Sequence, residues 1–422
     1  MDGAAATAAR QLGSMSLGES SGRANDEHDD DDDGFFFDAS SEHHYSEAEE
    51  EAVGGTATAA QLLGSVLLGG AVEGRDERRP QRPTFSGPGD AEKSGTPPAA
   101  ADKSCSACGE KSDSLKLCPW CQCVRYCDGD CQNEHHSEHR KECNAIKEVL
   151  DKRGGKLDLG TEKDVGPLPD LPPRDECPIC MCLMPLHTML HAYYTCCGKT
   201  ICGGCNLQHL MKNEESTCAF CREPIPTSDE QYLVRLHKRV ELKDPKALCN
   251  LAMNYVDGLR GLMGTYYGYG DLGLQVDQAK CVELLRQSAD LGFPEALYNL
   301  GVSHYVGEMG LEENEEEALK YCEQAAEGGI LLARHDVGSM KAGNGDDVVA
   351  GMPHWRLAAS GGYRSSMRVL IQYCFEDGLL RHADLAETLQ AFYRSRSEMK
   401  SEDRDEYIKH LKEIGEYEEE YE

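Results

Sequence analysis

The stretch from residue 105 to residue 143 reads CSACGEKSDSLKLCPWCQCVRYCDGDCQNEHHSEHRKEC and decides how this part of the chain folds. A structural zinc ion takes four thiolate or imidazole ligands in a tetrahedron, and a C-x-x-C turn places two sulfurs on one ion. Eight residues have this spacing, namely Cys105, Cys108, Cys118, Cys121, Cys127, Cys131, His139 and Cys143. Eight ligands predict two ions, whose binding supplies the folding free energy of so short a segment.

A second cysteine-rich stretch runs from residue 177 to residue 221 and again consists of C-x-x-C pairs. Its main candidate ligands are Cys177, Cys180, Cys196, Cys197, Cys202, Cys205, Cys218 and Cys221. The two stretches together hold seventeen of the 21 cysteines, whereas the last four are isolated. This clustering favours zinc over disulfides. We therefore expect two small zinc-stabilised fingers with about two ions each.

Composition and charge limit the function classes. The formal net charge of -32 disfavours nucleic acid and anionic membrane surfaces as partners, because like charges repel. The start MDGAAATAAR does not resemble a signal peptide, and the apolar stretch 59–72 is too short to span a membrane. We expect a soluble intracellular protein, in the cytoplasm or the nucleus.

The run RYCDGDCQNEHHSEHRKEC, from Arg125, resembles the MYND finger. The resemblance implies interleaved ligands, with Cys105, Cys108, Cys127 and Cys131 on one ion and Cys118, Cys121, His139 and Cys143 on the other. His136 stands where the family usually has Trp. We expect Cys123 to be an unligated thiol and His135 to be solvated.

MYND fingers often bind short peptides of the form P-x-L-x-P, so the resemblance implies proline-containing peptide partners. The chain contains one such sequence itself, PDLPP from Pro169 to Pro173. This segment could fold back into the finger's own groove, pair two molecules, or serve as an ordinary spacer.

The second stretch resembles a RING finger. The resemblance implies Cys177, Cys180, Cys202 and Cys205 on the first ion, and Cys218 and Cys221 with two further ligands on the second. The family's central C-x-H reads Cys197-Gly198-Lys199 here, and a protonated lysine cannot ligate. Cys196 is the expected replacement, with His209 as the alternative. Cys182, His187 and His191 are interpreted as bystanders.

RING fingers with ligase activity hold a ubiquitin-conjugating enzyme and perform no covalent chemistry themselves. Ile179 and Arg222 match the family's positions for contact with that enzyme and with ubiquitin, whereas Ala219 replaces a common proline. The resemblance therefore implies a ubiquitin ligase or ligase-like adaptor. The alternative is a non-catalytic scaffold that binds zinc and proteins. A methyltransferase is disfavoured, because the remaining residues form repeats rather than a cofactor-binding fold.

The C-terminal half contains helical repeats. The segments that begin at Gly292, Gly329 and Gly362 align, and an earlier copy begins at Asp244. Paired amphipathic helices at such a period predict an α-solenoid. These copies resemble Sel-one-like repeats, which are related to tetratricopeptide repeats and provide a concave face that can hold a protein partner.

The fold class is therefore multidomain: a disordered N-terminal region, two cross-brace fingers and a C-terminal all-α solenoid. The predicted ranges are a disordered acidic region 1–103, a first finger 104–144, a helix and proline-rich linker 145–174, a second finger 175–224, a solenoid 231–380, and a capping helix with an acidic tail 381–422.

Overall fold

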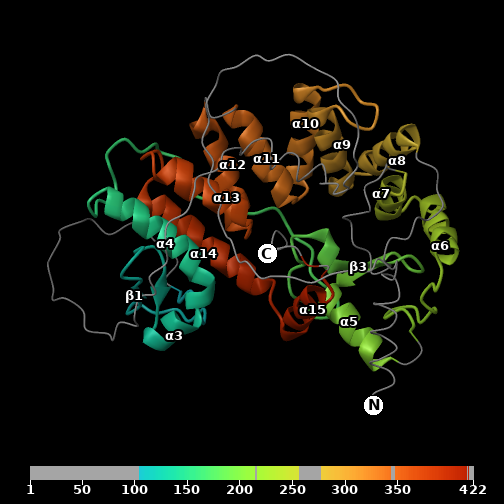
Figure 1. Cartoon of the computed structure of the whole chain (residues 1–422), viewed down its shortest axis with the longest axis horizontal. Coiled ribbons are helices and arrows are strands. Elements are labelled where there is room, and N and C mark those ends of the chain that lie inside the picture. The colour runs from blue at the N-terminus through green and yellow to red at the C-terminus, as the bar shows by residue number, and fades with distance from the viewer. Residues whose placement is uncertain (1–103, 214–215, 256–276, 344–346, 416, 418–422) are drawn as a thin grey trace, which may run out of the picture.

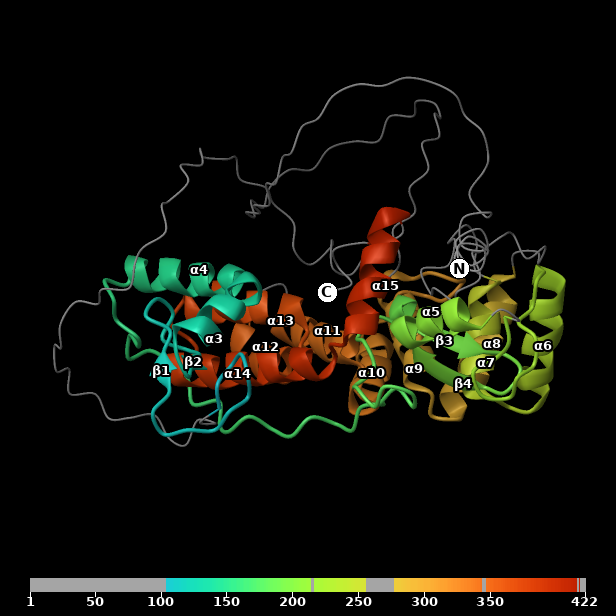
Figure 2. The ribbon, with the colours of Figure 1, turned by 90° about the horizontal axis from the view of Figure 1, so that it is seen from below.

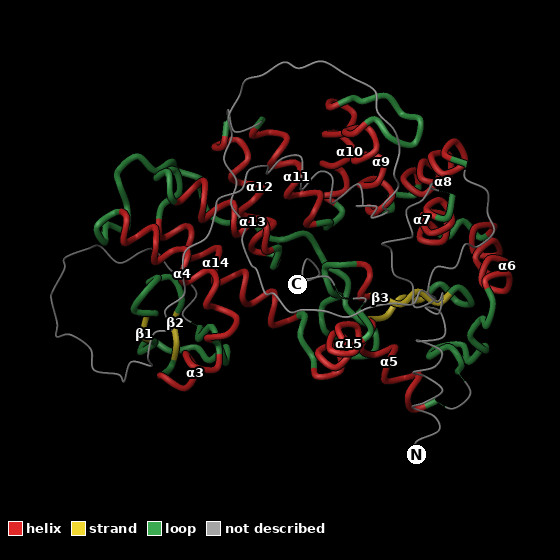
Figure 3. The backbone as a smooth tube through the Cα atoms, in the orientation of Figure 1, coloured by secondary structure: helices red, strands yellow, loops and turns green. Residues whose placement is uncertain are grey.

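A computed structural model describes residues 104–213, 216–255, 277–343, 347–415 and 417 (Figure 1). The predicted disordered region 1–103 and the last residues of the predicted acidic tail lie outside these ranges. Within them, no helix has both the length and the apolar character needed to cross a membrane. Helices dominate the described residues, and the strands form two short antiparallel pairs (Figure 3).

The first finger, residues 104–144, contains the hairpin β1 (Lys116–Leu117) and β2 (Arg125–Tyr126), in which Lys116 pairs with Tyr126. Two helices follow, α3 (Gly129–Glu134) and α4 (His136–Lys152). Asp128 caps α3 by accepting a hydrogen bond from the backbone N–H of Cys131. The hairpin and the two helices present the cysteines of the finger to one another.

The second finger, residues 175–224, contains the 3₁₀ turn η1 (Thr188–Leu190), the strands β3 (His191–Tyr194) and β4 (Lys199–Cys202), and the helix α5 (Gly203–Lys212). The two strands pair from His191 with Cys202 to Tyr194 with Lys199. Cys202 also caps α5 by accepting a hydrogen bond from the N–H of Cys205.

The repeats form pairs of antiparallel helices. The helices are α6 (Asp229–Glu241), α7 (Pro245–Met253), α8 (Gln278–Asp290), α9 (Pro294–Val306), α10 (Glu315–Glu327), α11 (Leu331–Ala342), α12 (Val348–Ser360), α13 (Arg364–Val369), the π-helical segment η2 (Leu370–Phe375) and α14 (His382–Glu398). The four positions aligned in the sequence, Ala247, Ala296, Ala333 and Ser366, are all fully buried. The predicted helical repeat solenoid is therefore confirmed.

Small residues allow the helices of a repeat to approach closely. A Cβ atom added to Gly301 in α9 would lie 2.6 Å from the sulfur of Cys322 in α10. A Cβ atom at Gly338 in α11 would lie 2.7 Å from Nε1 of Trp355 in α12. Larger side chains would force each pair apart, because closely packed interiors have no spare volume.

The solenoid curves around the second finger, and the first finger lies near its far end (Figures 1 and 2). Tyr193 of β3 belongs to the buried cluster of the first repeat and donates a 2.8 Å hydrogen bond to Asp244, the N-cap of α7. The first finger shares one buried cluster with α12, η2 and α14, which includes Cys118, Trp355 and Phe392. Both fingers therefore pack against the solenoid and share buried clusters with it.

The linker is held along the solenoid. Lys163 N–H donates to Leu379 O at 2.8 Å, Arg356 of α12 donates to Gly166 O at 3.0 Å, and Arg174 donates to Gly361 O at 3.0 Å. These anchors flank the PDLPP sequence on both sides. Both flanks of the sequence are therefore held on the solenoid, and its binding in the finger's own groove stays a prediction.

The prediction for the C-terminus needs correction. The described residues after 381 form two helices, of which α14 packs on the end of the solenoid, against α12. The second helix, α15 (Glu402–Glu413), packs on α5 of the second finger. Leu190, Leu207, Tyr407 and Leu411 form the buried contact. The helical spacing of α15 marks an apolar face, but the sequence does not indicate which surface that face covers.

Candidate metal centres

The thiol and imidazole groups of the two fingers form four clusters. In each cluster the possible ligand atoms lie within 4.8 Å of one another. The clusters are Cys105 with Cys108, Cys127 and Cys131; Cys118 with Cys121, His139 and Cys143; Cys177 with Cys180, Cys202 and Cys205; and Cys196 with Cys197, Cys218 and Cys221. Both fingers thus have the interleaved pairing that the family resemblances implied.

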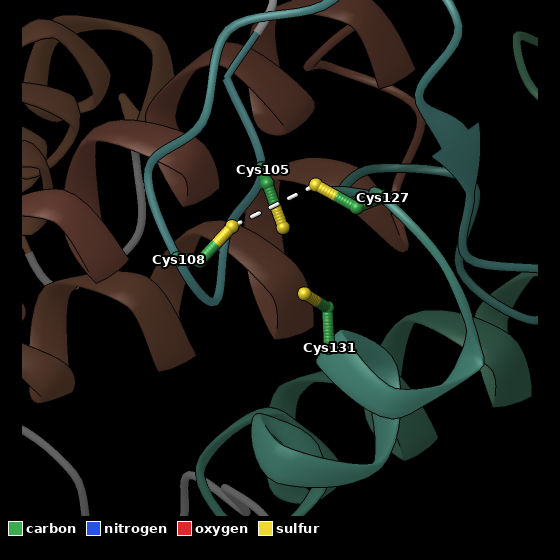
Figure 4. Close-up of side chains that lie close together, drawn as sticks. All are labelled: Cys105, Cys108, Cys127 and Cys131. Carbon is green, nitrogen blue, oxygen red and sulfur yellow. Dashed lines mark hydrogen bonds between the residues drawn. The ribbon is translucent and has the colours of Figure 1, made fainter.

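The first cluster joins the N-terminal knuckle of the first finger to Cys127, which lies between β2 and α3, and to Cys131 in α3. Its four sulfurs converge on one point, and those of Cys108 and Cys127 are 3.6 Å apart (Figure 4). The cluster is the more exposed of the two in this finger, since only Cys105 is buried.

The second cluster is fully buried and contains the single imidazole. Nε2 of His139 faces the cysteines and lies 3.3 Å from the sulfur of Cys121. Nδ1 of His139 lies 3.1 Å from the hydroxyl of Tyr393 on α14, and that hydroxyl donates to Glu142 at 3.0 Å. Arg364 of α13 forms an ion pair with the same carboxylate. This series of hydrogen bonds fixes the orientation of the His139 ring, as outer hydrogen bonds do for metal-binding histidines.

The third and fourth clusters give the second finger its cross-brace. The sulfurs of Cys180 and Cys202 are 3.9 Å apart, and those of Cys197 and Cys218 are 3.7 Å apart. Backbone N–H groups also point at the sulfurs. Hydrogen bonding from the Cys202 thiol and from nearby backbone N–H groups outweighs burial and lowers the pKa of Cys177 to about 4. These groups favour the thiolate, the form that binds metal.

The spacing of the sulfurs fits zinc. With Zn–S bonds of about 2.3 Å, a tetrahedron places its sulfurs about 3.8 Å apart. The sulfur pairs quoted above are 3.6 to 3.9 Å apart, and Cys118 and Cys143 are 3.7 Å apart. A disulfide would need about 2.05 Å, and all cysteines of the described residues are free. The donor sets of three thiolates and one imidazole, or four thiolates, are those of structural zinc sites.

The structure separates the two candidates for the fourth ligand of the second site. Cys196 lies 3.3 Å from Cys221 by sulfur distance, inside the cluster. His209 instead contacts the carbonyl of Thr217 with its Nε2 at 2.7 Å. Cys182 and His191 contact backbone carbonyls, and neither they nor His187 belong to a cluster among the described residues.

Two further buried residues, Cys123 and His135, lie near the second cluster. Cys123 is outside the cluster and fully buried, where its sulfur lies 3.3 Å from Nε2 of His382. His135 is not solvated, contrary to the expectation, because its ring is buried and its Nδ1 lies 3.0 Å from the hydroxyl of Tyr126. The ring also stacks on that of His139. Burial lowers the pKa of His135 to about 4, so the ring is neutral at pH 7.

Sequence reasoning missed the outer residues Tyr393, Glu142 and Arg364. The position of Glu142, three residues after His139 on α4, is a signal that could have found it, since such positions share a helix face. Tyr393 and Arg364 have no such signal, because they follow the ligand by more than 200 residues.

The two residues that match conjugating-enzyme contacts both lie on the surface of the second finger. Ile179 lies between Cys177 and Cys180 and is 46% exposed. Arg222 follows the last cysteine, is exposed, and adopts a positive φ of 65° at the end of the knuckle. The nearby Phe220 is 37% exposed. Exposed apolar side chains around a metal knuckle are available to a protein partner.

Comparisons with known proteins match the first finger and part of the repeats. The family model of the MYND finger matches residues 105–143, and that of the Sel1 repeat matches residues 245–293 and 294–330. One similar solved structure is that of c5321, a protective antigen present in uropathogenic Escherichia coli strains displaying an SLR fold. The match has 23% identity and a TM-score of 0.30, and it covers 45% of this chain and 37% of that chain. The chain thus contains a zinc-binding MYND finger followed, downstream of a second cysteine-rich finger, by Sel1 repeats.

Proposed function

We propose that this protein is a RING-type ubiquitin ligase or ligase-like adaptor. The observation that carries the proposal is the cross-brace of the second finger, in which Cys177, Cys180, Cys202 and Cys205 alternate along the chain with the second set of four cysteines. The sixteen clustered side chains of both fingers are the proposed zinc ligands, with two ions in each finger. In this role the second finger binds a ubiquitin-conjugating enzyme and orients its thioester, without a covalent catalytic residue.

The surface chemistry supports a contact with the conjugating enzyme. Ile179 and Phe220 lie on the two C-x-x-C knuckles that belong to different clusters, and both are exposed. Arg222 supplies a cation beside the second knuckle and has the donors to bridge two proteins. Helix α15 packs at the start of α5, at Gly203 and Gly204, and leaves Ile179 exposed.

The MYND finger and the solenoid are the proposed partner-selecting modules. Leu117 and Trp120 of the MYND finger are each 43% exposed, which suits an apolar peptide such as a proline-containing segment. The curvature of the solenoid is partly filled by the second finger, so substrates would contact the remaining surface of the repeats and the fingers together.

A zinc-binding scaffold without ligase activity is the second candidate. It is favoured by Ala219, which replaces the proline common before the last ligand, and by Lys199 in place of a histidine ligand. Under this alternative, the exposed knuckles of the second finger bind proteins but do not promote ubiquitin transfer.

The test is discharge of ubiquitin from a panel of charged conjugating enzymes onto free lysine, with the purified zinc-loaded protein. Ile179→Ala and Arg222→Ala should each slow discharge about tenfold, the effect of about 1.4 kcal/mol of lost contact. Val234→Ala, which removes two methyl groups from a 51% exposed residue on α6, is the matched control. Absence of discharge with every enzyme, while four zinc ions are bound, would reject the ligase in favour of the scaffold.

A further inference from the structure

Arg404 lies in the first turn of α15, far downstream of the second finger, yet its side chain reaches a knuckle of that finger. Its guanidinium Nη2 lies 3.4 Å from the sulfur of Cys180 and 3.3 Å from the carbonyl oxygen of Cys182. Its Nη1 donates to the carbonyl of Leu183 at 2.5 Å and to that of Met399. The residue is only 5% exposed. One buried cation therefore holds the knuckle, the following loop and the turn between α14 and α15.

A buried guanidinium needs a compensating negative charge. Within the described residues, the hydrogen-bond acceptors of Arg404 are carbonyl oxygens and one sulfur, and none is a carboxylate. Four thiolates around a divalent zinc ion carry a net charge of about -2. The cluster of Cys177, Cys180, Cys202 and Cys205 is thus the negative group that the cation faces.

We propose that Arg404 is an outer-sphere positioning residue of this metal centre, and that α15 is therefore a structural part of the second finger. The inference depends on zinc binding at this cluster and not on ligase activity. Arg404 balances the charge of the thiolates and donates toward the sulfur of Cys180. Cys180 is only half-buried, whereas the other three cysteines of its cluster are buried. Arg404 thus protects the sulfur that solvent, acid and chelators reach first.

The backbone contacts around Arg404 support the same conclusion. Leu183 N–H donates to Glu398 O at 3.1 Å, so the loop after the knuckle pairs with the end of α14. A Cβ atom at Gly204 would lie 2.6 Å from the backbone of Asp403, which shows how closely α15 approaches α5. These contacts fix the start of α15 independently of the guanidinium, so Arg404 can be changed without removing the helix.

The same turn is also tied to the solenoid. Arg174 of the linker donates to Ser395 on α14 at 2.7 Å and to Gly361 O at 3.0 Å, and its other terminal nitrogen contacts Met399. Arg174 also donates to Met184 O in the finger at 3.3 Å. Through Arg404 and Arg174, the geometry of the knuckle depends on the docked end of the solenoid.

The test uses the full-length zinc-loaded protein and measures zinc release to a chromogenic chelator. Arg404→Met keeps an unbranched apolar stem and removes the charge and the donors of the side chain. It should accelerate the release of one zinc equivalent by about tenfold or more, the usual range for outer-sphere residues. In the cadmium-loaded protein, it should shift one ¹¹³Cd resonance of a four-thiolate site. Lys409→Met on the same helix is the control, because Lys409 is exposed and its ion pair with Glu413 is long, at 3.9 Å.

Wild-type release of all zinc equivalents from a folded Arg404→Met variant would overturn the proposal. If that variant does not fold, Arg404→Lys decides the question. A lysine supplies the charge, but one ammonium group cannot serve the sulfur and the separate carbonyls together. Release at least about threefold faster than wild type is expected from this variant, and an unchanged rate would overturn the proposal.

Discussion

The substitution Tyr393→Phe tests whether the solenoid supports the histidine of the MYND finger. The hydroxyl of Tyr393 lies 3.1 Å from Nδ1 of His139 and donates to Glu142 at 3.0 Å. The variant removes one oxygen and retains the ring, which meets the ring of His135 edge-on at 4.5 Å. The change therefore isolates the hydrogen bonds from the packing.

The expected magnitude follows from the burial of the groups involved. His139 is 4% exposed and Glu142 is 6% exposed, so water cannot easily replace the hydroxyl. A buried polar group that loses its partner costs about 1–3 kcal/mol. Glu142 keeps its ion pair with Arg364, so the unpaired Nδ1 of His139 dominates the loss. Loss of an outer-sphere partner weakens metal binding about 10- to 100-fold, which is consistent with this range.

The assay is competition for zinc against a chelator of known affinity, followed by zinc content and by near-ultraviolet circular dichroism. One of the four zinc equivalents should be lost at about 10- to 100-fold lower chelator concentration than in the wild type. Tyr373→Phe is the matched control, because Tyr373 is 41% exposed on the same end of the solenoid. If all equivalents keep wild-type affinity in a folded Tyr393→Phe variant, the proposed support of His139 is refuted.

Three further predictions follow from other contacts. Gly204→Ala should loosen α15 and raise hydrogen exchange of its amides, whereas Gly129→Ala, at the start of α3 with open space around it, should not. Burial raises the pKa of Asp336 from 3.8 to about 7, so its contribution to stability is complete below pH 3.8 and is lost as the pH rises through 7. The stability of the wild type relative to Asp336→Asn, measured with urea, should therefore fall between pH 5.5 and 8 by at most about 2 kcal/mol, because about 1.5 pH units of the shift lie above pH 5.5. Cys202→Ser should release zinc from the second finger alone. Cys118→Ser should release zinc from the first finger and also raise amide hydrogen exchange in α12 and α14, because Cys118 shares a buried cluster with these helices. The same hydrogen-exchange pattern in both variants would contradict the shared core.

The local pattern of the sequence was sufficient for the C-x-x-C pairs and the repeats. C-x-x-C spacing acts over one tight turn, so Cys118 and Cys121 are neighbours wherever the finger lies. The interleaving of the pairs came from the resemblance to known fingers, and the clustering in the structure has the same arrangement. Helical periodicity and aligned small residues such as Ala296 predicted the solenoid, because each repeat buries its apolar face against the next.

Burial of a single polar residue was harder to predict. His135 is adjacent to the exposed His136 and has no periodic signal, and the sequence suggested a solvated ring. The structure buries it between Tyr126 and Tyr393, whose rings meet it edge-on. Tertiary packing determined this environment, since one of the two rings comes from α14.

The sequence by itself determined the C-x-x-C pairs and that the C-terminal half is helical, because both depend on contacts between residues close along the chain. The resemblance to known fingers supplied the joining of those pairs into four clusters. Only the tertiary structure decided that the solenoid curves around the second finger, that Tyr393 supports His139, and that α15 docks on α5 with Arg404 beside Cys180. The contacts of Tyr393 with His139 and of Arg404 with Cys180 join residues more than 200 positions apart. Their partners are selected by shape and by the satisfaction of buried charge, and neither property appears in a local pattern of residues.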